Sequence, residues 1–205
     1  MIPMSPTVKQ LLIINIIFFV GTWLIGDLAY VHLGLVPFQN EAFRPWQLVT
    51  NMFMHFDIRH IAFNMLALYS FGSALEYIWG AKKFLFFYIS CGLGAGLLQN
   101  GIFYMNGIDA ALVLGASGAV YGLMTAFAFM FPESRMGLML IPVSIKAKYF
   151  VPIVLSIDYL LGFYGSSFFS RSTGVAHFAH LGGALIGFIM MWYWKKNSFN
   201  NRRWN

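Results

Sequence analysis

Charged residues are scarce in this chain. Of its 205 residues, 10% are charged and 59% are hydrophobic, whereas about 25% of the residues in an ordinary soluble domain are charged. A soluble fold must bury most of its apolar surface, but a protein in a lipid bilayer can leave that surface against the acyl chains. The composition therefore excludes an ordinary soluble domain and indicates a membrane protein.

Cysteine is nearly absent, since Cys91 is the only one. A single thiol excludes an intramolecular disulfide and provides no cluster of thiolates for a metal. Gly92, Gly94 and Gly96 follow closely, so we interpret Cys91 as a small residue at a helix contact. Internal repeats and low-complexity tracts are also lacking, which predicts one domain over residues 1–205.

Long apolar segments are what the sequence has instead. A transmembrane helix needs about 20 consecutive apolar residues, and six segments approach or reach that length: 10–35, 61–78, 84–105, 113–131, 149–164 and 174–194. The first is too long for the core of a signal peptide and lacks a small-residue cleavage site after it, so we expect it to remain as a helix. The sequence therefore predicts an all-α membrane protein with six transmembrane helices.

The basic residues indicate an orientation. The net charge is +6, but ten of the thirteen basic residues precede the first segment, follow the sixth, or lie between segments two and three or four and five. Arg44, Arg59 and Arg171 fall on the other side. Because Lys and Arg are enriched in cytoplasmic loops, both termini are predicted to be cytoplasmic. The positive charge thus reflects topology, and no nucleic-acid partner is expected.

Polar residues within or beside the predicted helices are few: His55, His60, Asn64, Ser117, Asp158, His177 and His180. Such residues are costly in a membrane and indicate function. Predicted spans two, four and six run in the same direction, which places residues 55–64, Ser117 and His180 near one depth. The helix from Ser117 to Phe131 would be about 22 Å long, against a hydrocarbon core of about 30 Å. Ser117 is therefore predicted to lie below the outer surface.

Ser117 lies in the sequence Gly115-Ala116-Ser117-Gly118, at a predicted helix start. The backbone N–H there has no partner within the helix, and the helix dipole favours an oxyanion beside it. A histidine that titrates near neutral pH is the usual base for a serine nucleophile. Taken alone, the short motif is more typical of a small polar residue at a helix contact.

Ser117 and His180 each precede a pair of glycines on one helix face: Gly118 and Gly122 after the serine, Gly183 and Gly187 after the histidine. Glycines at this spacing allow two helix backbones to approach closely. A hydrogen bond of about 2.6–3.2 Å between a serine and a histidine requires such an approach. The spacing is therefore compatible with a contact between Ser117 and His180, and a purely structural role for His180 stays open at this point.

His60 and Asn64 are one helical turn apart, and His55 precedes them. Asn64 and His55 can donate hydrogen bonds, so they could complete an oxyanion hole, whereas His60 is interpreted as a polar contact between helices. Metal ligation is the alternative interpretation. The chain has no H-E-x-x-H motif, and Asp57 is the one acidic residue nearby, so neither a metal nor a cofactor is expected.

Together these residues resemble a known family. The run 45–50 (PWQLVT), followed by His55, His60, Asn64, Glu76 and Gly80, looks like the start of a rhomboid core. Residues 115–121 and 179–183 resemble the serine and histidine motifs of rhomboid intramembrane proteases. The resemblance covers residues 8 to 194 approximately, and departs at Trp46-Gln47, where some members carry Trp-Arg.

The resemblance implies a six-helix rhomboid bundle with a Ser–His dyad rather than a triad. Ser117 would attack the scissile carbonyl and His180 would transfer the proton. His55, Asn64, Gly115 and Tyr121 would serve oxyanion or substrate binding, with Tyr121 also packed on the His180 ring. The structural positions would be His60, Glu76, Gly118 and Gly183.

Two polar residues have no place in that dyad. Asp158 belongs to the fifth predicted span and has no evident route to His180, which agrees with a dyad. His177 lies one turn before His180 and is interpreted as a second polar contact or a residue lining a water site.

The expected activity is hydrolysis of peptide bonds in or near transmembrane segments of membrane-protein substrates, through an acyl-enzyme. The lipid bilayer is the second expected partner, and the location is predicted to be a bacterial inner membrane. Three alternatives stay open: an inactive rhomboid-like protein that binds transmembrane helices, a haem carrier ligated by the buried histidines, and a transporter, which the few charges within the spans disfavour.

Overall fold

The structure is a computed structural model, and it describes residues 3–137, 144–168 and 176–200. Helices dominate the described residues, with one two-stranded antiparallel sheet in which Arg135 pairs with Lys146. In chain order the elements are α1 (Pro6–Ile25), α2 (Asp27–Leu33), α3 (Gln47–Thr50), the 3₁₀ turn η1 (Asn51–Phe53), α4 (Ile58–Ala67), the π-helical turn η2 (Leu68–Gly72), α5 (Ser73–Trp79), α6 (Ala81–Met105), α7 (Ser117–Met130), β1 (Arg135–Gly137), β2 (Ser144–Lys146), α8 (Ala147–Phe168) and α9 (His177–Asn200).

The helices agree with an all-α membrane protein. Among the described residues, three helical stretches are long and apolar enough to cross a bilayer: Pro6–Ile25, Ile58–Trp79 and Ala81–Met105. A shorter apolar helix covers Ser117–Met130. Each of the six predicted segments overlaps a helix of the structure, but the count of six membrane crossings stays a prediction.

One predicted segment is interrupted in the structure. The segment 10–35 is broken at Gly26, whose φ of 73° lies in the left-handed region that favours glycine. The chain continues beyond it as the separate short helix α2. Within the segment 113–131 the helix begins at Ser117, as predicted, because the residues before it form a loop that pairs Val113 with Leu35. The start of the segment 174–194 lies outside the described residues.

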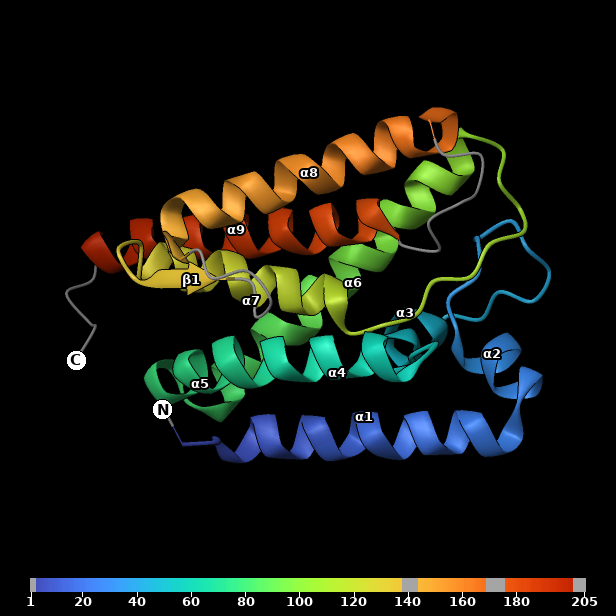
Figure 1. Ribbon diagram of the computed structural model, residues 1–205, viewed down its shortest axis with the longest axis horizontal. Coiled ribbons are helices and arrows are strands. Elements are labelled where there is room, and N and C mark those ends of the chain that lie inside the picture. Colours follow the sequence, from blue (N-terminus) through green and yellow to red (C-terminus); the bar gives the residue numbers. More distant parts are fainter. Residues whose placement is uncertain (1–2, 138–143, 169–175, 201–205) are drawn as a thin grey trace.

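The long helices run side by side, and α6 crosses the bundle at a tilt (Figure 1). The start of α1 and the end of α9 lie at the same end of the molecule, while α2 and α3 lie at the other end (Figure 1). The central helix is α7, which packs against α4, α6, α8 and α9. Its inward residues Val120, Leu123 and Ala126 are buried against residues of α6 that include Phe84 and Phe87.

The outer surface of the bundle is apolar. Trp23 and Leu24 of α1 are 81% and 72% exposed, and Phe86 of α6 is 63% exposed. Water would penalise a surface on which so many large apolar side chains are exposed, whereas lipid acyl chains would not. This exposed apolar surface agrees with an all-α membrane protein.

Glu76 joins the start of α1 to α5. Its carboxylate accepts hydrogen bonds of 3.0 Å from the backbone N–H groups of Thr7 and Val8, and one from the Ser5 hydroxyl. The first N–H groups of a helix have no acceptors within it. The buried Glu76 carboxylate therefore accepts hydrogen bonds from donors at the start of α1 that would otherwise have no partner. Glu76 thereby fixes α1 to the rest of the bundle.

The contact between α7 and α9 is the closest helix contact described here, and glycines make it possible. A Cβ atom on Gly183 would overlap the Gly118 carbonyl group and lie 3.2 Å from its Cα. One turn further, a Cβ on Gly187 would lie 2.9 Å from the Gly122 carbonyl oxygen. The two backbones can therefore touch only where both helices lack side chains.

Replacing Gly183 by alanine is expected to lower the free energy of unfolding by about 1–3 kcal/mol, because the new methyl group forces α7 and α9 apart. The matched control is Gly101→Ala in α6, where a Cβ meets no atom within 4 Å. That control should leave stability unchanged or raise it by about 1 kcal/mol through helix propensity. Denaturation of both variants in detergent micelles tests this, and equal stabilities would contradict it.

Candidate active site

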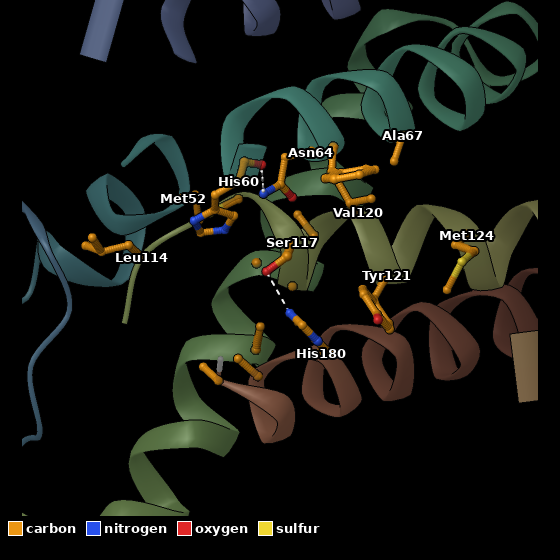
Figure 2. Close-up of a pocket in the computed structure, with 18 of the residues that line it drawn as sticks. Met52, His60, Asn64, Ala67, Leu114, Ser117, Val120, Tyr121, Met124 and His180 are labelled. Atoms are coloured by element: carbon orange, nitrogen blue, oxygen red, sulfur yellow. Dashed lines mark hydrogen bonds between the residues drawn. The ribbon is translucent and has the colours of Figure 1, made fainter. Parts of the chain in front are cut away.

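A pocket of about 1030 Å³ opens between α4 on one side and α8 and α9 on the other, and α7 forms its floor. Figure 2 shows Ser117, Tyr121, Asn64, His60 and His180 among the residues that line it. Most of the other lining residues are apolar. The polar groups therefore gather in one part of a pocket that otherwise suits an apolar ligand.

Ser117 is the first residue of α7. That helix has 14 residues, or about 21 Å at 1.5 Å per residue, and it begins near the middle of the molecule (Figure 1). The preceding loop reaches this depth through Gly115, whose φ of 121° suits glycine and whose N–H donates to the Asn51 carbonyl over 2.9 Å. Ser117 thus lies at a buried helix start.

His180 reaches Ser117 from the facing helix. Its Nε2 atom lies 2.9 Å from Ser117 Oγ, a hydrogen-bonding distance (Figure 2). The Tyr121 ring stacks on the His180 ring, with 4.2 Å between centroids and 11° between planes. These contacts follow from the glycine-mediated approach of α7 and α9, so the structure brings together the serine, the histidine and the tyrosine that the sequence singled out.

Asp158 was expected to have no route to His180, and this expectation is wrong. Its Oδ1 atom lies 3.2 Å from Nδ1 of His180 and 2.7 Å from Nδ1 of His177. The expectation failed because it took separate predicted spans to be separate in space, whereas α8 packs against both α7 and α9.

The spacing of residues on α8 explains how Asp158 arrives there. Phe150, Val154 and Asp158 are four residues apart, so they follow one another along one helix face, and the first two line the pocket. Gly162 continues the face, and a Cβ there would lie 3.1 Å from Cβ of His177. Two features of the sequence could have indicated this contact. One is the spacing along α8, and the other is a single acidic residue in one span with two histidines at i and i+3 in another.

Asp158, His177 and His180 also have the spacing of metal ligands. Their three nearest donor atoms lie within 4.8 Å of one another, and all three residues are buried. The Asp–His distances of 2.7 and 3.2 Å are those of hydrogen bonds.

His60 lines the pocket, whereas His55, which was predicted to contribute to the oxyanion hole, is not among the lining residues. His60 lines the pocket with Asn64, and its Nε2 atom lies 2.7 Å from where a Cβ on Gly115 would be. His55 is fully buried behind it, with its ring edge-on to that of His60 at 4.9 Å. The physical reason is that His60 shares a face of α4 with Asn64, whereas His55 precedes the helix and turns inward.

The environment of His55 does not suit a hydrogen-bond donor to a substrate. His55 is fully buried and is not among the residues that line the pocket, so a substrate in the pocket does not meet its ring. It therefore packs the wall of the site from behind.

Comparison with known proteins identifies the family. The sequence profile of the rhomboid domain matches residues 42–197. The chain belongs to the rhomboid family. It is 31% identical over 152 residues to Rhomboid protein 1, mitochondrial, of Saccharomyces cerevisiae, and 30% identical over 159 residues to the human Presenilin-associated rhomboid-like protein, mitochondrial. It is also 31% identical over 144 residues to Rhomboid protease GluP of Bacillus subtilis.

These alignments cover 73%, 76% and 70% of this rhomboid chain, but 42%, 39% and 25% of the three relatives. The chain therefore spans less than half the length of each. Family membership and the apolar helices support an integral membrane protein. The predicted bacterial inner membrane is not borne out, because two of these relatives are mitochondrial proteins.

Proposed function

We propose that this rhomboid protein is an intramembrane serine protease that cleaves peptide bonds in or near transmembrane segments of other membrane proteins. The observation that carries the proposal is the 2.9 Å distance between Ser117 Oγ and His180 Nε2 within a mostly apolar pocket. The relative from Bacillus subtilis is named as a rhomboid protease. Ser117 is then the nucleophile and His180 the general base.

Acylation begins when Ser117 Oγ attacks the carbonyl carbon of the scissile bond while its proton moves to His180 Nε2. The tetrahedral intermediate collapses by breaking the C–N bond, and His180 returns the proton to the leaving amine. Water then attacks the resulting ester, again giving a proton to His180. That proton passes to Ser117 Oγ as the carboxylic acid product leaves.

The oxyanion of the tetrahedral intermediate needs hydrogen-bond donors that are already in place. Three groups around the pocket suit this: the Ser117 backbone N–H at the helix start, the Asn64 side-chain amide and the His60 ring. The amide of Asn64 already donates to the His60 carbonyl over 3.0 Å and has a second N–H available. His60 thus replaces His55 in the proposed oxyanion hole.

The substrate is proposed to enter from the membrane beside α8, as the family resemblance implies. Phe150 and Val154 of α8 line one side of the pocket, and Phe63 of α4 lines the other. An apolar entrance of this kind would accept a transmembrane segment more readily than a soluble peptide. The choice of the peptide bond to be cleaved would then depend on where the transmembrane segment unwinds beside Ser117.

Six crossings with both termini on the cytoplasmic side are part of the same proposal. The distribution of basic residues supports it, as does the common end of the molecule at which α1 begins and α9 ends (Figure 1).

Cysteine labelling tests the topology. Lys82 in the first turn of α6 and Asn106 just after its end are both exposed, so Lys82→Cys and Asn106→Cys should lie on opposite sides. In sealed right-side-out vesicles, an impermeant maleimide should modify Asn106→Cys at once and Lys82→Cys only after permeabilisation. Modification of both from outside would contradict the topology.

Ser117→Ala and His180→Ala are each expected to lower cleavage of a reporter transmembrane substrate in proteoliposomes by about 10⁴-fold or more, since either change removes the attacking group or its base. Both variants should retain the melting temperature of the wild type to within a few degrees. A serine-directed fluorophosphonate should label the wild type and not Ser117→Ala. Wild-type cleavage in either alanine variant would exclude the proposal, and substrate binding without cleavage by the wild type would favour the inactive-relative alternative.

His60→Ala and His55→Ala separate the two histidines. Loss of one oxyanion donor costs about 10²–10³-fold in kcat, so His60→Ala should lower kcat by that factor with little change in KM. His55→Ala should chiefly lower the melting temperature, because it leaves a cavity in a buried position. Steady-state kinetics on folded protein measure both effects. A larger loss of kcat in His55→Ala than in His60→Ala would reverse the assignment.

A further inference from the structure

We propose that Asp158 of α8 is a positioning residue that orients His180 and stabilises its protonated form, with His177 holding the carboxylate in place. This inference rests on the proposed protease function and extends the dyad to a Ser117–His180–Asp158 arrangement. It is carried by the 3.2 Å distance from Asp158 Oδ1 to His180 Nδ1 and the 2.7 Å distance to His177 Nδ1.

An ionised carboxylate can only accept hydrogen bonds. If one Asp158 oxygen accepts from both rings, each histidine carries its proton on Nδ1. The Nε2 atom of His180 then has a free lone pair, and this is the atom that lies 2.9 Å from the Ser117 hydroxyl. The carboxylate therefore selects the tautomer in which His180 can act as a base toward Ser117.

Burial restricts the orientation of the His180 ring and of the Asp158 carboxylate. Asp158 is 6% exposed, and His177 and His180 are each 8% exposed. A buried carboxylate is strongly disfavoured unless hydrogen-bond donors surround it. His177 supplies a further donor to Asp158, so the position of the carboxylate does not depend on His180 alone. The carboxylate is held ready for the charge that develops during the reaction.

Proton transfer leaves all atoms and charges accounted for. When Ser117 gives its proton to Nε2, His180 becomes an imidazolium whose Nδ1–H still donates to the Asp158 carboxylate. Asp158 stays ionised, and the proton on Nε2 later passes to the leaving amine. The carboxylate lowers the energy of the imidazolium and takes up no proton itself.

The three residues come from three helices: Ser117 from α7, His180 from α9 and Asp158 from α8. Glycine contacts fix α7 and α9 against each other, whereas Asp158 shares its helix face with the pocket residues Phe150 and Val154. The orientation of His180 therefore depends on α8 lying against the bundle.

Asp158→Asn preserves the size of the side chain and removes its charge. In proteoliposomes it should lower kcat for the reporter substrate by about 10²–10⁴-fold, with KM within about twofold of the wild-type value because the pocket lining is unchanged. Ser156→Ala is the matched control: Ser156 is exposed on the same helix and its hydroxyl bonds to the Pro152 carbonyl. The control should keep wild-type kcat.

The pH profile of kcat/KM separates positioning from a structural role. The groups that face His180 are Asp158 and His177, Tyr121 and Ser117 of α7, and His60 across the pocket. Removing the carboxylate destabilises the imidazolium, so the acidic limb should move to lower pH in Asp158→Asn. A structural defect would lower the profile without moving it.

Asp158→Glu is the second variant. It keeps the carboxylate but displaces it by one methylene, so its kcat should exceed that of Asp158→Asn by at least about tenfold while the acidic limb stays near the wild-type position. If Asp158→Asn does not accumulate in folded form, this variant carries the test through its retained pH profile. A displaced acidic limb in Asp158→Glu, or equal losses of kcat in the two folded variants, would overturn the proposal.

Two further results distinguish the possible failures. If Ser117→Ala still cleaves the reporter substrate, the proposed protease function itself is wrong. If Ser117→Ala is inactive but Asp158→Asn keeps full activity and an unchanged pH profile, only the proposed role of Asp158 is wrong. Loss of wild-type activity on adding a metal chelator would also overturn the role, because the cluster would then be ligating an ion.

Discussion

The contact between α7 and α9 is the constraint on which the candidate site depends. Gly118 and Gly122 on one helix meet Gly183 and Gly187 on the other, so the two backbones approach without intervening side chains. Ser117 and His180 project from the N-terminal ends of these same contacts, and their 2.9 Å separation is a consequence of them. With larger residues at the contact, the serine and the histidine would lie too far apart to share a proton.

The depth of the site follows from a second constraint, the short length of α7. Because this helix begins in the interior, the loop before it must descend into the bundle, and buried backbone groups must find partners there. The pairing of Val113 with Leu35 and the bond from Gly115 to Asn51 supply them. The same arrangement leaves the N–H of Ser117 at a helix start beside the pocket, where a negatively charged oxygen would be stabilised.

The polar residues of the bundle form two sets with different surroundings. Asp158, His177 and His180 satisfy one another through hydrogen bonds, and such a network keeps one geometry in a low-dielectric interior. The ring nitrogens of His55 have no hydrogen-bond partner among the described residues, and its ring packs edge-on against that of His60. Glu76, far along the bundle, uses its carboxylate to fix the start of α1.

The sequence by itself determined the class of the protein, most of the helices and the meeting of Ser117 with His180. These follow from local properties: apolar segments long enough for a bilayer, and glycines at helical spacing beside each residue. What only the tertiary structure decided was which side chains reach the pocket from other helices. His60 rather than His55 lines it because of the direction in which α4 presents its face, and Asp158 reaches His180 because α8 packs on α9. Spacing along one helix is written in the sequence, whereas the rotation of one helix against another is set by packing over the whole bundle.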